Sequence, residues 1–171
     1  MKIDELTRRR VEAALLARDG SCRDINFSES ILTSRAIEVL QFLASSWTYV
    51  RGMTGDSDEI ASAELEGNLQ LASGSLSIIW NGGRNPEHIQ AYFYWNESDK
   101  VFCEITFFPQ DIDSGTFKLI EFLSMLGKLV SVAGSDEYYL GSEDASWRHL
   151  QQKDDAVILS DKVLLLSLIH I

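Results

Sequence analysis

Residues 88 to 95 read HIQAYFYW, and residues 101 to 108 read VFCEITFF. Both runs are rich in β-branched and aromatic residues, which favour strands over helices. The segment between them, Asn96 to Lys100, has the polar composition typical of a hairpin loop. The two runs therefore predict adjacent antiparallel strands in the middle of the chain.

The first of these runs alternates in polarity, with an apolar residue at every second position. Successive side chains of a strand point to opposite faces of a sheet, so this alternation predicts a strand with two different faces. We expect the more apolar face to be buried beneath helices. That face carries Ile89, Ala91, Phe93 and Trp95, and the other face carries Gln90, Tyr92 and Tyr94.

Further strands are predicted outward from this hairpin, because β-forming runs recur between clusters of Gly, Asn, Pro, Asp and Ser. Residues 21 to 27 mix polar and apolar types and predict an irregular strand or a loop. The clearer predicted strands cover residues 47–51, 69–72, 75–81, 137–140 and 156–160.

Three segments carry apolar residues at helical spacing, namely residues 4–18, 34–45 and 115–132. Thr33 precedes the second segment and is of a type that can cap a helix. The sequence thus predicts an α+β fold, with a mainly antiparallel sheet of about five to seven strands and about three helices packed largely on one face.

The length of 171 residues suits one domain that buries its own core, and no repeat or linker divides it. We expect a single α+β domain over residues 1–165. Residues 166–171 read LSLIHI and resemble the translated end of a transposon used to prepare sequencing libraries. We interpret them as a non-native tail, the alternative being an apolar edge strand.

The overall charge constrains the class of partner. Asp and Glu number 26 against 15 Lys and Arg, which gives a formal net charge of −11. A field of this sign repels nucleic acid and anionic lipid, so we expect neither nucleic acid nor membrane as a partner. A basic protein is the favoured partner, since opposite charge accelerates encounter. Acidity that serves solubility alone is the other interpretation.

The sequence shows no metal or cofactor motif. Cys22 and Cys103 lie far apart without CxxC spacing, and we expect two free, reduced thiols in a cytoplasmic protein without a signal peptide. The run GDSDE at 55–59 places Ile60 and Gly67 where a calcium loop needs ligands. Residues 81–86, NGGRNP, lie between two predicted strands and indicate a turn. We therefore predict no metal and no cofactor.

Two stretches have the composition of a partner-binding surface. One is RDINF at residues 23–27, where an Arg and an Asp are adjacent in a semi-apolar segment. The other, residues 138–148, combines Tyr, Trp and Arg with acids, as interface hot spots do. The structural alternative is that Asp24 and Asn26 tie down a loop, and that Tyr139 and Trp147 belong to the core or its rim. The predicted partner-binding residues are Asp56, Asp58, Glu59, Tyr139, Glu143, Asp144 and Trp147.

The plan of residues 1 to 160 carries a family resemblance. Two N-terminal helices flank CRDINF, an aromatic meander and a long amphipathic helix follow, and EYYLGSEDASW and AVILS come last. This plan resembles small acidic bacterial immunity proteins of polymorphic and contact-dependent toxin systems. The resemblance implies a non-catalytic cytoplasmic protein that binds and neutralises a cognate, basic toxin domain.

A rival hypothesis is an enzyme whose site is assembled from residues distant in the sequence. Its members would be Cys22, Asp24 and His149, with a thiol and an imidazole as the reactive pair. The sequence near each thiol has none of the local features that activate a cysteine, so catalysis is the less favoured interpretation.

Overall fold

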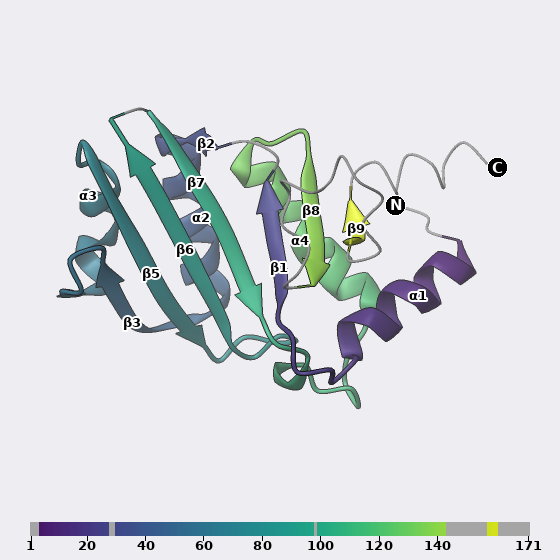
Figure 1. Ribbon diagram of the computed structural model, residues 1–171. Coiled ribbons are helices and arrows are strands. Elements are labelled where there is room, and N and C mark those ends of the chain that lie inside the picture. The colour runs from purple at the N-terminus through teal and green to yellow at the C-terminus, as the bar shows by residue number, and fades with distance from the viewer. Residues whose placement is uncertain (1–3, 28–29, 98, 143–156, 161–171) are drawn as a thin grey trace.

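The fold was analysed in a computed structural model, which describes residues 4–27, 30–97, 99–142 and 157–160. Its centre is a mainly antiparallel sheet with the strand order β4-β3-β5-β6-β7-β1-β8-β9, and β2 pairs with β7 beside this path. Figure 1 shows the strands side by side, with α2 and α4 behind them and α1 beyond the β9 edge. The protein is thus an α+β fold, as the sequence predicts.

All described strand pairs are antiparallel. In sheet order the strands are β4 (Glu59–Ile60), β3 (Thr48–Thr54), β5 (Ser73–Asn81), β6 (Ile89–Asn96), β7 (Lys100–Phe107), β1 (Arg23–Phe27), β8 (Tyr138–Ser142) and β9 (Val157–Ser160), with β2 at Ile31–Leu32.

The helices pack mainly on one face of this sheet, where α2 and α4 contact each other. Helix α1 contacts β9 at the sheet edge. The helical elements are α1 (Glu5–Leu16), α2 (Thr33–Ser46), α3 (Leu65–Leu69) and α4 (Leu119–Ala133), with 3-10 turns η1 (Ser62–Glu64) and η2 (Pro109–Asp111).

The hydrophobic core lies between the sheet and these helices. Every second residue of β6, from Ile89 to Trp95, is buried there, which confirms the predicted alternation. Helix α4 adds Phe122, whose ring packs edge-on against Phe107 of β7 with centroids 5.7 Å apart. Helix α4 ends at Gly134, which adopts the left-handed conformation that glycine tolerates best.

One predicted strand is wrong. Residues 69–72 were expected to be extended, but Leu69 ends the helix α3. Leu65 and Leu69 are four residues apart and both are buried, so a short helix places them on one face against the core. The chain then turns, and the carbonyl of Leu71 accepts a hydrogen bond from Trp95 Nε1 at 2.9 Å.

Two helix starts also differ from the prediction. Thr33 does not cap α2, because its hydroxyl donates to the carbonyl of Asp99 and Leu32 takes the N-cap position. Helix α4 begins at Leu119 and not at residue 115. Before it, the Asp113 carboxylate accepts bonds from the Gly115 amide and the Thr116 hydroxyl, which holds residues 113–116 in a turn.

The sheet is larger than predicted, with nine described strands where about five to seven were expected. The described residues also form four α-helices where about three were expected. The main reason for the larger sheet is residues 21–27, for which the sequence allowed either an irregular strand or a loop. Residues 23–27 form β1, an interior strand between β7 and β8. The remaining additions are the two-residue strands β2 and β4 and the short helix α3, which are too brief to produce a periodic pattern.

Candidate functional site

The face of the sheet opposite α2 and α4 is the candidate site, and we call it the open face. On β6, the residues that alternate with the buried ones point to this face. Tyr92 and Tyr94 are 38% and 48% exposed there, and Ile79 of the neighbouring strand β5 is 41% exposed. Three large, partly apolar side chains therefore lie on a face that these helices leave uncovered.

Strand register aligns one residue from each of eight strands into a row on this side of the sheet, where Asn26 and Ser160 are buried. Residues paired in register on neighbouring strands point to the same face and lie close enough for their side chains to interact. The row runs Glu59, Met53, Ser77, Tyr92, Glu104, Asn26, Tyr139 and Ser160.

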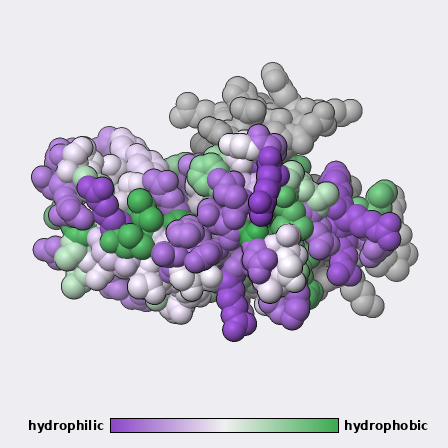
Figure 2. Space-filling model, turned by 90° about the horizontal axis from the view of Figure 1, so that it is seen from below, coloured by the Kyte–Doolittle hydropathy of each residue, from purple (hydrophilic) through white to green (hydrophobic). Residues whose placement is uncertain are grey.

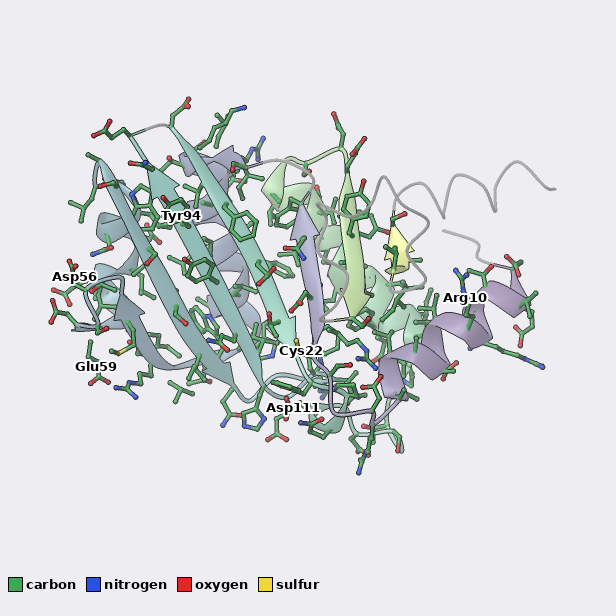
Figure 3. The ribbon with its side chains drawn as sticks, in the orientation of Figure 1. Arg10, Cys22, Asp56, Glu59, Tyr94 and Asp111 are labelled. Atoms are coloured by element: carbon green, nitrogen blue, oxygen red, sulfur yellow. The ribbon has the colours of Figure 1, made fainter. Side chains whose placement is uncertain are left out.

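Aromatic side chains gather near the middle of this row. The rings of Tyr92 and Phe102 meet edge to face, with centroids 6.4 Å apart and planes at 63°. Tyr94 is paired in register with Phe102, so the three rings occupy adjacent positions on β6 and β7. Figure 3 places Tyr94 over the sheet, away from the labelled acids Asp56 and Glu59 at the sheet end. Exposed aromatic clusters of this kind are enriched in protein interfaces.

A group of hydrogen-bond acceptors follows the aromatic residues along the row, and we name Asp24, Asn26 and Glu104 the acceptor cluster. Asp24 accepts a 2.6 Å hydrogen bond from the hydroxyl of Thr106, its register partner on β7. Burial, and then the negative charge of Asp24, raise the pKa of Glu104, while a hydrogen bond from Asn26 opposes the shift. Two carboxylates therefore sit close together in partly buried positions.

Asn26 is 4% exposed, and its side-chain oxygen Oδ1 has no hydrogen-bond partner among the described residues. A buried polar group without a partner costs folding free energy of about 1–3 kcal/mol. Such groups are rare in folded proteins and call for a physical explanation. Here the unpaired atom is an acceptor that lies beside two carboxylates.

Arg23, the neighbour of Asp24, belongs to the opposite side of β1 and is 2% exposed. Its Nε donates to the carbonyl of Ala14 at 3.0 Å, and Nη2 donates to the carbonyl of Ala17 at 3.1 Å. Nη2 also pairs with the Asp19 carboxylate at 3.0 Å, and hydrogen bonding to Arg23 lowers the pKa of Asp19 to about 2. Arg23 therefore ties the end of α1 to the sheet and does not pair with Asp24.

The predicted binding residues lie at two ends of the molecule. Asp56, Asp58 and Glu59 are exposed in the β3–β4 hairpin, where Glu59 is 3.6 Å from Arg51. Tyr139 lies on β8, six strand spacings from Glu59 in the sheet order, or roughly 30 Å at the usual spacing of strands. The open-face row links Glu59 to Tyr139 without bringing them into contact. Glu143, Asp144 and Trp147 lie outside the described residues.

Sequence reasoning missed the centre of this face. Tyr92 was assigned to the less buried side of its strand, yet it was not proposed as a binding residue. Asp24 and Asn26 were noted within a possible loop. The signal that could have found them is the alternation in residues 23–27, where Arg23, Ile25 and Phe27 take one side and Asp24 and Asn26 the other.

The rival catalytic set is assembled only in part. Cys22 and Asp24 lie together, with the thiol 3.6 Å from the Asp24 carboxylate, while His149 is outside the described residues. A carboxylate repels a thiolate, so this neighbour does not activate Cys22 as a nucleophile. Burial and the charge of Glu104 raise the pKa of the other thiol, Cys103. The described contacts therefore do not activate either thiol.

The metal-ligating side chains and the helices of the described residues bear on other kinds of site. No group of three or more His, Cys, Asp or Glu side chains in that part of the chain is arranged to hold a metal ion. No described helix is long and apolar enough to cross a membrane. Figure 2, seen from below the view of Figure 1, shows a mostly hydrophilic end with small hydrophobic patches between polar side chains.

The fold resembles that of a chain in a solved toxin complex. The 1.75 Å crystal structure is of the toxic C-terminal tip of CdiA from Pseudomonas aeruginosa in complex with immune protein. The TM-score is 0.59, and the match covers 82% of this chain and 94% of that chain at 16% sequence identity. At this identity the likeness concerns the fold alone. No protein-family model and no curated protein matches the sequence.

Proposed function

We propose that this chain is an immunity-type protein, which binds a cognate toxin domain in the cytoplasm and neutralises it. The observation that carries the proposal is the shared fold with a chain of a complex between a toxic tip and its immune protein. That complex contains both a toxin and an inhibitor, so further properties of this chain are needed to choose between the two roles.

Charge favours the inhibitor role. The net charge of −11 suits a protein that binds a basic partner, and it disfavours a toxin that acts on nucleic acid. Within the described residues, the proposed catalytic thiol Cys22 is buried and next to a carboxylate. These features support a protein that acts by binding and occlusion.

The open face is the proposed contact surface. It offers an aromatic centre around Tyr92 and Tyr94 with acidic groups on both sides. Protein interfaces commonly have such an apolar core surrounded by a polar rim. Exposed acids of the β3–β4 hairpin extend this surface at one end. The earlier candidates remain proposed contacts around the centre, namely Asp56, Asp58, Glu59, Tyr139, Glu143, Asp144 and Trp147.

The test is co-expression and binding with a toxin domain, taken from a toxin gene beside this gene where the genome carries one. Cells that express the toxin domain alone should stop growing, and co-expression of this chain should restore growth. The purified chain should form a stable complex with the toxin domain in gel filtration, at an affinity that falls as salt concentration rises. No complex and no protection, with both proteins folded, would refute the proposal.

A further inference from the structure

No cationic side chain among the described residues pairs with the acceptor cluster. None of the ion pairs formed by the described residues includes Asp24 or Glu104. The nearest residue in sequence that could neutralise Asp24 is Arg23, and its guanidinium is committed to Asp19 and to the carbonyls at the end of α1. The negative charge of the cluster is therefore not balanced by a described cationic side chain.

Three acceptors of the cluster lie on the same side of two neighbouring strands. Asn26 and Glu104 are register partners on β1 and β7, and Asp24 lies two residues from Asn26 on the same face. Asn26 Oδ1 lacks a donor among the described residues, whereas Asp24 and Glu104 are partly exposed and so remain accessible. A ligand for this cluster must supply several N–H donors together with positive charge.

A guanidinium group meets this requirement. It is planar, always charged, and carries five N–H donors that can reach several acceptors at once. Tyr92 is the register partner of Glu104 on β6, so an aromatic ring borders the cluster and offers a surface for stacking. A metal ion fits less well, because no described group of three His, Cys, Asp or Glu side chains is arranged to hold one.

We propose that Asp24, Asn26 and Glu104 bind an arginine side chain of the toxin domain beside Tyr92, near the centre of the open face. This inference rests on the proposed function, since it names the chemistry of the partner at that surface. The arginine relieves the repulsion between the two accessible carboxylates, and its guanidinium, once inserted between them, brings a donor towards the buried Asn26 Oδ1. The acceptor cluster therefore lowers the stability of the free protein and raises its affinity for the toxin domain.

Isosteric variants test this inference with the cognate toxin domain as the probe. Glu104→Gln and Asp24→Asn each remove a charge but keep the shape of the side chain. Calorimetric titration should show each variant binding the toxin domain about thirtyfold more weakly than wild type. Glu121→Gln is the matched control, because it removes one charge from α4 on the other side of the sheet, and its affinity should stay within about twofold.

The outcomes separate this inference from the proposed function. A wild-type chain that does not bind the toxin domain refutes both. Wild-type binding with unchanged affinity in folded Glu104→Gln and Asp24→Asn refutes the arginine site and leaves the immunity role intact. The thermal midpoint of each variant reports its folding, and the two substitutions serve as independent tests if one of them fails to fold.

Discussion

The two faces of the sheet use the same strands for different purposes. On β6, Phe93 is fully buried between the strands and the helices, whereas its neighbour Tyr94 is 48% exposed on the open face. The covered face is built from apolar side chains that contribute to stability by leaving water. The open face combines exposed aromatic rings with a pair of carboxylates. Burial, and then the negative charge of Asp24, raise the pKa of Glu104, so ionised Glu104 costs stability.

If the open face binds the toxin domain, as proposed, this difference separates residues that serve folding from residues that serve binding. A residue that stabilises the fold should lower stability when it is truncated and leave the affinity of the folded protein unchanged. A residue that serves the partner should have the opposite profile. Substitutions on the two faces therefore test the comparison through two readouts, the free energy of unfolding and the affinity for the toxin domain.

The largest expected effect is on the covered face. Phe93→Ala removes a fully buried ring and should lower the free energy of unfolding by about 3–5 kcal/mol. The matched variant Tyr94→Ala, one residue away on the open face, should cost less than about 1 kcal/mol. Urea unfolding measures both values, and equal losses would contradict the assignment of the two faces.

Adjacent residues of β1 offer a second contrast. Arg23→Met leaves buried carbonyls near the end of α1 without their donor and should cost about 2–3 kcal/mol of stability. Toxin affinity of the folded Arg23→Met protein should not change. Asp24→Asn should show the reverse pattern, with stability retained and affinity reduced. Thermal unfolding and titration of the two variants compare them directly, and a stable Arg23→Met would show that this contact is dispensable.

Truncation of the aromatic centre should affect binding more than folding. Tyr92→Ala removes a ring that contacts Phe102 and borders Glu104, and it should weaken toxin binding by about 2 kcal/mol, as hot-spot residues do. Its thermal midpoint should fall only slightly. Ile120→Ala, at an exposed position of α4 on the helix layer, is the control and should leave the affinity unchanged. Equal affinities for Tyr92→Ala and wild type would remove Tyr92 from the proposed interface.

The smallest expected effect concerns Glu104 in the free protein. Its pKa is higher in the folded than in the unfolded state, so its ionisation disfavours folding. This penalty is absent at pH values below the pKa that Glu104 has in the unfolded protein. It grows as pH rises and is fully present above the pKa that Glu104 has in the folded protein. Glu104→Gln should therefore raise the thermal midpoint at pH 7, and the gain should vanish as pH falls below the unfolded pKa. A variant less stable than wild type at pH 7 would contradict this reasoning.

The local sequence predicts the two faces of β6 because alternation with a period of two is visible over eight residues. The same pattern in β1 is harder to recognise, since Arg23 occupies a buried position where an apolar residue is expected. Its burial is explained by hydrogen bonds to α1, which depend on tertiary structure. Helix α3 was missed because two leucines four residues apart are too short a pattern to outweigh the neighbouring strand-like residues.

The composition of the candidate site depends on pairing between distant parts of the chain. Asn26 meets Glu104 through the register of β1 and β7, and Tyr92 joins them through the register of β6 and β7. A strand does not specify its distant neighbour by local pattern, so the sequence identified acidic and aromatic stretches but not their meeting point. Glu59 and Tyr139 were predicted as binding residues, and register places them far apart in one row.

The central claim is that the open face contacts the toxin domain, and hydroxyl-radical footprinting of the complex tests it most directly. Tyr92 and Tyr94 report on the open face, and Ile120 of α4, which is 65% exposed, is the control on the other layer. Toxin binding should protect both tyrosines from oxidation and leave Ile120 as reactive as in the free protein. Protection of Ile120 with both tyrosines still reactive would place the contact on the helices and rule out the open face as the contact surface.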